Sequence, residues 1–286
     1  MSAAPDTIVL IHGLFLDSRS WEGWVHRYSS RGHHVLAPSW PGLEAGVEEV
    51  RRDPTPLTEL DVPKIVEHYD NIVRDLDRPP IIMGHSTGAA VMQVLVDRGL
   101  GAAGVGIEPA TVKGIYDLPR STLKATFPVL GNPFNRGKAT MLTQEQFNYG
   151  FTNTFDDAAA KAAYARYAIP CANRVLFQLA FQNFPWTNAT KVNFAKPDRA
   201  PLLFLNGEED HIIPAKVGAK IARKHGRSRA PVDYKAYPGR AHFTMVQEGW
   251  EEVADYALDW AVEHAGATAP AVEEAREGPA ATADPA

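Results

Sequence analysis

The sequence predicts an α/β fold with a mostly parallel, doubly wound sheet, and two recurring patterns predict it. Short, continuous apolar runs, of which residues 8–11 are the first, are typical of strands that are buried on both faces. Segments with a single apolar face lie between these runs and indicate helices that pack on the sheet. Such alternation of strand and helix is the pattern of a parallel sheet covered by helices.

The individual elements follow in chain order. The expected strands are residues 8–11, 34–37, 80–83, 104–107, 202–205 and 232–236. The expected helices of the core are residues 20–30, 61–76, 89–98, 214–225 and 248–262. Asp61 is a favoured residue at a helix start, and Pro63 suits the first turn. The stretch from residue 38 to about residue 60 is rich in Pro and Gly and is expected to be a loop.

The alternation breaks down between residues 108 and 197, where aromatic residues and short helices such as 143–150 and 157–169 are expected. The pattern Thr143-x-x-Gln146 is a capping box that starts the first of these helices. We therefore predict a core that is interrupted by an insertion and followed by a tail poor in large apolar residues. The predicted units are residues 1–109 (first part of the core), 110–200 (a helical cap over the site), 201–265 (second part of the core) and 266–286 (a disordered tail).

The composition of the chain excludes several kinds of binding partner and covalent link. The 286-residue chain has a net charge of −5 and no cluster of Lys and Arg, so no nucleic-acid partner is expected. Cys171 is the only cysteine, which excludes an intramolecular disulfide and a thiolate metal site. Neither a signal-peptide pattern nor an apolar run of membrane-spanning length is present. We expect a cytoplasmic protein without a membrane partner, and the sequence leaves open whether it forms a homodimer.

The pentapeptide Gly84-His85-Ser86-Thr87-Gly88 carries the strongest functional signal. The pattern G-x-S-x-G also occurs by chance, but here it joins an expected strand to an expected helix. A sharp turn in that position holds the serine hydroxyl exposed at the end of the strand. The pattern therefore predicts that Ser86 is a nucleophile.

Two further motifs follow expected strands near the C-terminal end of the core. Residues 206–214 read Asn-Gly-Glu-Glu-Asp-His-Ile-Ile-Pro and follow the strand 202–205. Residues 238–243 read Pro-Gly-Arg-Ala-His-Phe and follow the strand 232–236. Sites of doubly wound sheets form at the carboxyl ends of strands, so Asp210 and His242 are expected near Ser86.

With these motifs the chain resembles the α/β-hydrolase superfamily, in its serine esterase and lactonase branch with a helical cap. The resemblance covers about residues 7–264 and depends on His12-Gly13, the serine turn, Gly207…Asp210…Pro214 and Gly239…His242. It implies the α/β-hydrolase fold, with Ser86 as nucleophile, Asp210 as acid and His242 as base. It also implies an oxyanion hole formed by the backbone N–H groups of Leu14 and Thr87. No cofactor and no metal ion are expected.

Several of these assignments have alternatives. Glu108 follows the strand 104–107, where some members of the superfamily carry the acid, and Asp210 could instead cap the helix near Pro214. Glu208 and Glu209 are weaker candidates for the acid. For His12 and His211 the sequence favours hydrogen bonding within loops, and for His85 it favours support of the turn.

The insertion is rich in aromatic residues, which predicts an apolar substrate pocket. The expected pocket residues are Phe15, His85, Phe181, Trp186 and Phe243. These features predict a serine hydrolase that cleaves a small, largely apolar ester or lactone through an acyl-enzyme.

Other chemistries of the superfamily are less compatible with the sequence. Haloalkane dehalogenases and epoxide hydrolases place Asp where this chain has Ser86. Hydroxynitrile lyases carry a hydroxyl residue and a lysine where this chain has Gly13 and Phe243. A different lyase, a cofactor-free oxygenase or a ligand receptor stays open as an alternative.

Overall fold

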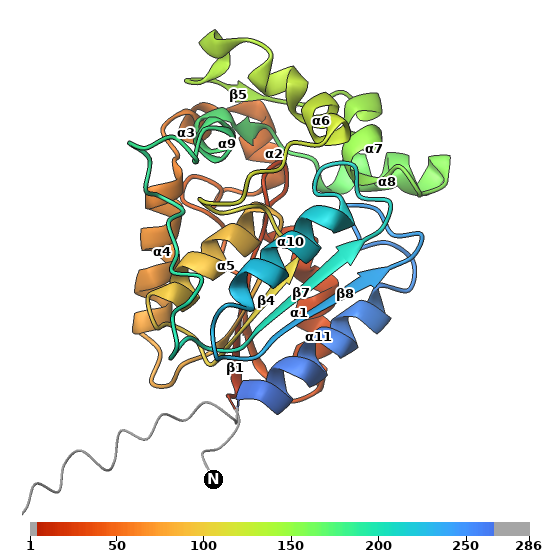
Figure 1. Cartoon of the computed structure of the whole chain (residues 1–286). Helices are drawn as coiled ribbons and strands as arrows, with labels where there is room; N and C mark the ends of the chain where they lie inside the picture. Colours follow the sequence, from red (N-terminus) through yellow and green to blue (C-terminus); the bar gives the residue numbers. More distant parts are fainter. Residues whose placement is uncertain (1–4, 266–286) are drawn as a thin grey trace, which may run out of the picture.

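The structure is a computed structural model that describes residues 5–265, and its centre is a parallel sheet of six strands (Figure 1). The order across the sheet is β2-β1-β3-β4-β7-β8, and every neighbouring pair is parallel. The strands are β1 (Thr7–Ile11), β2 (His34–Leu36), β3 (Ile81–His85), β4 (Ala103–Ile107), β7 (Leu202–Gly207) and β8 (Val232–Tyr237). The predicted α/β class with a parallel sheet is confirmed.

Helices cover both faces of this sheet (Figure 1). One face carries α1 (Glu22–Ser30), preceded by the short 3₁₀ helix η1 (Ser18–Trp21), together with α11 (Trp250–Ala265). The other face carries α4 (Val62–Arg74), α5 (Thr87–Asp97) and α10 (Ala215–His225). Strands β1, β3, β4 and β7 are buried between these layers, which explains why they read as continuous apolar runs.

The local signals in the sequence agree with the helix starts. The side chain of Asp61 accepts a hydrogen bond of 3.0 Å from the backbone N–H of Lys64 and so caps α4. Thr143 and Gln146 form the predicted capping box at the start of α7 (Gln144–Phe151). Both helices therefore begin where the sequence places them.

The prediction of a loop from residue 38 to about residue 60 is wrong in part. Two short helices, α2 (Val47–Arg52) and α3 (Thr55–Thr58), lie in this stretch. Their apolar residues Val47, Val50 and Leu57 are buried in the core. Helices of this length show less than two turns of apolar periodicity, which is too little for a sequence pattern to reveal.

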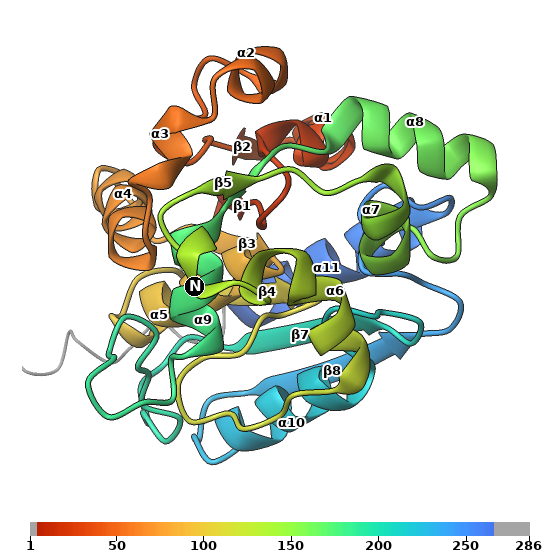
Figure 2. The same cartoon turned by 90° about the horizontal axis from the view of Figure 1, so that it is seen from above.

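Residues 108–201 form the segment between β4 and β7, and the part up to α9 (Asn173–Ala180) lies over the carboxyl ends of the strands (Figures 1 and 2). The stretch after α9 runs back along the side of the molecule to the start of β7. Besides α7 the segment holds four helical elements: α6 (Arg120–Leu130), η2 (Pro133–Asn135), α8 (Asp157–Tyr167) and α9. Strands β5 (Ala139–Thr140) and β6 (Cys171–Ala172) pair within it as a small antiparallel sheet. We name residues 108–201 the inserted segment; its role as a cap stays a prediction.

Two further expectations from the sequence concern the C-terminal tail and membrane-spanning helices. The predicted disordered tail, residues 266–286, lies outside the described residues. Among residues 5–265, no helix combines the length and the apolar character that crossing a bilayer requires.

Helix α5 approaches strands β1 and β3 so closely that two glycines are required. A Cβ atom on Gly88 would lie 2.1 Å from the carbonyl oxygen of Ile11, and one on Gly84 would lie 2.3 Å from the backbone of Gly88. Backbone atoms can avoid contacts this short with an added Cβ only if the strand or the helix moves. These two glycines therefore set where the first turn of α5 lies.

Replacing Gly88 by Ala should destabilise the protein by about 2 kcal/mol or more, because the added methyl group forces α5 away from β1. Urea unfolding would measure the loss. Gly137→Ala is the matched control, since its added Cβ would meet nothing within 4 Å. Equal stability of the two variants would show that α5 does not depend on this contact.

Candidate active site

Ser86 lies in the sharp turn between β3 and α5. Its backbone has φ 52° and ψ −118°, and a positive φ is costly for a residue with a side chain. The N–H of Ser86 donates to the carbonyl of Ile107 over 2.9 Å, and its own carbonyl accepts from the N–H of Ala110 over 3.0 Å. These bonds to the end of β4 hold the strained turn in place.

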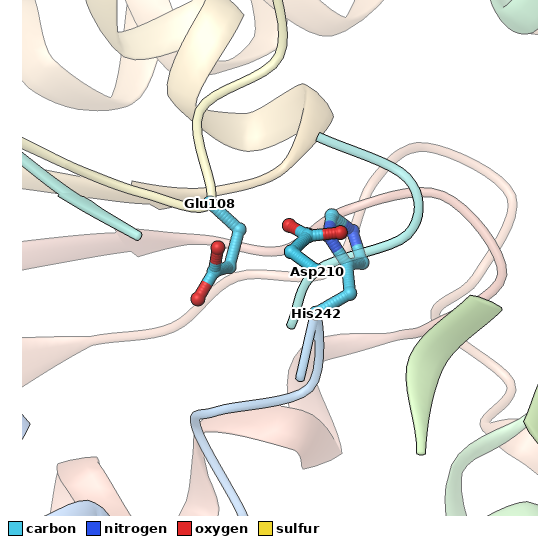
Figure 3. Close-up of side chains that lie close together, drawn as sticks. All are labelled: Glu108, Asp210 and His242. Carbon is cyan, nitrogen blue, oxygen red and sulfur yellow. The ribbon is translucent and has the colours of Figure 1, made fainter. Parts of the chain in front are cut away.

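Asp210 and His242 form a fully buried pair (Figure 3). Asp210 Oδ2 accepts a hydrogen bond of 2.7 Å from Nδ1 of His242. Asp210 Oδ1 accepts from the backbone N–H groups of Ile212 and Ile213 over 2.7 and 2.8 Å. The carboxylate is thereby fixed from both sides, and it does not cap α10, whose cap residue Pro214 makes no side-chain bond.

The other nitrogen of His242 is available for chemistry. Nε2 is buried and has no hydrogen-bond partner among residues 5–265. His242 and Ser86 line the same cavity, although they come from loops that are far apart in the chain. The structure thus brings Ser86, Asp210 and His242 to one end of the sheet, as the chain order of the motifs suggests.

Glu108 is a second buried carboxyl group beside Asp210 (Figure 3). It follows β4 with a positive φ of 46°, and both of its oxygens accept from the N–H of Gly207, over 2.8 and 3.0 Å. Oε2 also accepts from Nδ2 of Asn206 over 3.1 Å. Glu108 therefore sits directly behind the Asp210–His242 pair.

The pKa values of the two carboxyl groups are shifted in opposite directions. Burial and the neighbouring charge of Asp210 raise the pKa of Glu108 well above its ordinary value, which favours its neutral form. Burial alone would raise the pKa of Asp210 too, but His242 outweighs it by charge and hydrogen bonding and lowers that pKa. Of the two groups, Asp210 is therefore the one whose surroundings favour the charged form.

Glu108, Asp210 and His242 also have ligand atoms within 4.8 Å of one another, a spacing that could hold a metal ion. The nitrogen of His242 on this side carries the proton of the bond to Asp210, so its lone pair is not free to bind a metal. Both oxygens of Glu108 already accept hydrogen bonds from Gly207, and its raised pKa further weakens it as a ligand. Hydrogen bonding explains this cluster without an ion.

The remaining histidines near the site are engaged in local hydrogen bonds. His85 donates from Nε2 to the backbone carbonyl of His242 over 2.9 Å, and burial lowers its pKa to about 3. His12 accepts from the N–H of Trp40 over 3.2 Å, and burial lowers its pKa to about 4. His211 bonds the carbonyl of Tyr149 over 2.8 Å. His85 and His12 are therefore neutral near pH 7.

Leu14 and Thr87 both line the cavity beside Ser86. Thr87 is the first residue of α5, so its N–H has no acceptor within its own helix. Phe15, which follows Leu14, has a positive φ of 64°, so the backbone turns sharply at this point. This arrangement is compatible with two backbone donors that face the cavity, and the oxyanion hole stays a prediction.

The cavity has a volume of about 490 Å³ and is lined mostly by apolar side chains. Phe15 is among the lining residues, but the other four expected pocket residues are not. His85 and Phe243 are fully buried beneath the cavity, whereas Phe181 and Trp186 are 49% and 76% exposed. Aromatic content predicted an apolar cavity correctly but could not show which rings face it.

Small residues of α6 form part of the cavity wall that the sequence analysis missed. Thr122, Ala125 and Thr126 line the cavity at a spacing of three and four residues. That spacing is the helical period, so a stripe of small residues along one side of the helix was the available signal.

Comparison with known proteins places the chain in a family. Residues 8–256, most of the chain, match the model of the Alpha/beta hydrolase family. The chain therefore belongs to the alpha/beta hydrolase family. A comparison with curated proteins gives no match.

Solved structures with the same fold cover nearly the whole chain at low sequence identity. The Paleococcus ferrophilus monoacylglycerol lipase has a TM-score of 0.63 and 17% identity, over 92% of this chain and 96% of the lipase. Tomato methylketone synthase I in complex with 2-tridecanone has a TM-score of 0.68 and 15% identity, over 92% and 100%. The pyrethroid hydrolase PytH has a TM-score of 0.64 and 18% identity, over 90% and 97%. This likeness shows the fold alone.

Replacing Glu108 by Gln should change how stability depends on pH. Because the pKa of Glu108 is raised by folding, its contribution to stability is complete below the unfolded pKa and is lost as the pH rises toward the folded pKa. As the pH rises above about 5, the wild type should lose up to about 1.4 kcal/mol per pH unit relative to the variant. Urea unfolding of both proteins at several pH values measures this difference. A difference that is constant over the range would mean that Glu108 is ionised in the folded protein.

Proposed function

We propose that this protein is a serine hydrolase that cleaves a small, largely apolar ester or lactone through an acyl-enzyme intermediate. The observation that carries the proposal is the fully buried bond of 2.7 Å between His242 and Asp210, which lies next to a cavity that His242 shares with the strained Ser86. Nucleophile, base and acid in this arrangement are a triad. A cytoplasmic location and catalysis without a cofactor or metal belong to the same proposal.

The proposed reaction has two halves. Ser86 Oγ attacks the carbonyl carbon of the substrate while its proton passes to Nε2 of His242. The bond from that carbon to the leaving oxygen then breaks, His242 returns the proton to this oxygen, and the acyl group stays on Ser86. A water molecule then repeats the sequence: its proton passes to His242 while its oxygen attacks the acyl carbon. The bond from that carbon to Ser86 Oγ breaks, His242 returns the proton to Oγ, and the carboxylic acid leaves.

Asp210 and the backbone donors stabilise the charges that arise in these steps. The carboxylate of Asp210 keeps the proton on Nδ1, so Nε2 is the nitrogen that accepts from Ser86. The negative oxygen of the tetrahedral intermediates would accept from the N–H groups of Leu14 and Thr87. Loss of one such donor typically costs about 10²–10³ in kcat.

The cavity supports a neutral, apolar substrate. Among residues 5–265, Asp117 is the only acidic or basic lining residue apart from His242, and Asp117 pairs with Lys220 over 3.2 Å. None of the described lining residues is a lysine or arginine that could bind a carboxylate or phosphate of the substrate. The names of two structural neighbours, a lipase and a pyrethroid hydrolase, also support an ester as the substrate class.

Ser86→Ala should abolish hydrolysis of p-nitrophenyl esters, by a factor of about 10³ or more, and should abolish labelling by a fluorophosphonate. Both reactions need the serine oxygen, and the thermal melting temperature should stay close to that of the wild type. Turnover by a pure Ser86→Ala preparation would contradict the proposal. Labelling of the wild type without hydrolysis of any ester or lactone would favour a non-hydrolytic enzyme, and absence of labelling would favour a receptor.

The cavity also predicts selectivity for chain length. For p-nitrophenyl esters, kcat/KM should rise by up to a few-fold with each added methylene, about 0.8 kcal/mol per CH₂, until the cavity is full. Ala125→Leu narrows the cavity and should move the optimum to a shorter chain, because Ala125 lines it.

Trp186→Ala is the control for this series, since Trp186 does not line the cavity and should leave the optimum unchanged. The opposite pattern, with Trp186→Ala moving the optimum and Ala125→Leu leaving it in place, would show that substrate binds elsewhere.

A further inference from the structure

Exposed apolar side chains gather on one part of this molecule. Within residues 5–265, every large hydrophobic side chain that is exposed lies between residues 116 and 186, inside the inserted segment. The α/β core, with more residues than the segment, exposes none of comparable size. Such concentration is unusual on a soluble surface and marks an interaction site.

Helix α6 and the loop after it form the main part of this surface. Leu123 and Phe127 lie one turn apart on α6 and are 46% and 69% exposed, and Phe134 in η2 is 83% exposed. Leu118 before the helix and Met141 after β5 are exposed as well. Figures 1 and 2 show α6 and β5 together at the end of the molecule beyond the carboxyl ends of the strands. We name the exposed side chains of residues 118–141 the apolar-basic face.

The charges on this face are all of one sign. Arg120, Lys124, Arg136 and Lys138 are exposed, and none of them forms an ion pair with another described residue. The only acidic residue between positions 117 and 142 is Asp117, which Lys220 already neutralises. The chain as a whole carries a net charge of −5. The four cations without an ion pair therefore make this face positive on a protein that is negative overall.

The cavity opens beside the apolar-basic face. Four of its lining residues are exposed, and all four belong to the inserted segment: Tyr116, Leu118, Gln146 and Ala180. Leu118 belongs to both the cavity and the face. Phe181, Phe184 and Trp186 extend the apolar surface beyond Ala180, with ring centroids 5.8 and 4.8 Å apart.

We propose that the apolar-basic face docks peripherally onto an anionic lipid surface, with the cavity mouth at the contact. Leucine and aromatic side chains interleaved with Lys and Arg are the composition of segments that lie in the interface of a bilayer. The cations would attract anionic headgroups, while the apolar side chains enter the boundary with the acyl chains. An apolar ligand could then pass from lipid to cavity without crossing water.

A second copy of the chain fits this face less well. In a two-fold dimer through the same face, the unpaired cations Arg120, Lys124, Arg136 and Lys138 of one copy would meet those of the other. The sequence predicts no membrane partner because it contains no apolar run long enough to span a bilayer. A surface that binds a membrane peripherally needs no continuous apolar run in the sequence. It can be recognised only when the fold shows which side chains are exposed together.

Binding to vesicles tests this proposal without reference to catalysis. The wild type should sediment with vesicles that contain phosphatidylglycerol, more weakly with vesicles of phosphatidylcholine alone, and less at high salt. Phe127→Ser with Phe134→Ser should reduce binding about tenfold or more, because the apolar contact is lost. Arg136→Gln with Lys138→Gln should reduce it roughly thirtyfold.

The matched control for the charge variant is Arg227→Gln with Arg229→Gln. It changes the net charge by the same amount at exposed arginines of the α/β core, and it should leave vesicle binding unchanged. An equal loss of vesicle binding in the two charge variants would show that binding depends only on the net charge of the protein. That result would overturn the proposal. Melting temperatures of all variants show that each is folded.

Two further outcomes are decisive. Wild-type protein that stays in the supernatant with anionic vesicles would overturn the proposal. A dimer in solution that Phe127→Ser with Phe134→Ser converts to a monomer, without vesicle binding, would assign the face to a second copy instead. Hydrolysis of a soluble p-nitrophenyl ester is measured separately, so failure of docking and failure of the proposed function are distinguished.

Discussion

The arrangement of the site depends on two buried carboxyl groups whose pKa values are shifted in opposite directions. Glu108 and Asp210 lie side by side within 4.8 Å, where two negative charges without water would repel each other strongly. Glu108 accepts hydrogen bonds from the last residues of β7, whereas Asp210 accepts from the loop after β7 and also bonds the imidazole of His242. That last bond favours the charge on Asp210, fixes the proton on Nδ1 and leaves Nε2 without a partner among the described residues. Glu108 holds the end of β7 in place behind this pair.

The sequence predicted the elements that local patterns encode and missed those that depend on packing. Parallel strands bring their carboxyl ends to one edge, so motifs at residues 86, 210 and 242 could be expected together before any contact was known. Helices α2 and α3 are too short for a periodic pattern. The orientation of Phe181 and Trp186 depends on how the inserted segment folds back, and the raised pKa of Glu108 depends on its burial beside Asp210. Neither can be inferred from residue type alone.

Helix α6 connects the cavity to the surface of the molecule. Its small residues Ala125 and Thr126 line the cavity, while Leu123 and Phe127 point outward from the same turns. A single helix therefore forms part of the wall on one side and part of the apolar-basic face on the other. A shift of α6 would change both surfaces together, because the cavity mouth at Leu118 lies just before the helix begins.

The two surfaces also differ in charge, and this difference bears on the direction of the proposed reaction. The proposed ester hydrolysis would convert a neutral substrate into a carboxylate, inside a cavity whose wall, among residues 5–265, contains Asp117 and no lysine or arginine. Such a cavity would disfavour the charged product relative to the neutral substrate. The cations of the apolar-basic face lie outside the mouth, where they would favour an anion that is leaving. If the protein acts as proposed, this distribution of charge would favour binding of a neutral substrate and release of the acid product.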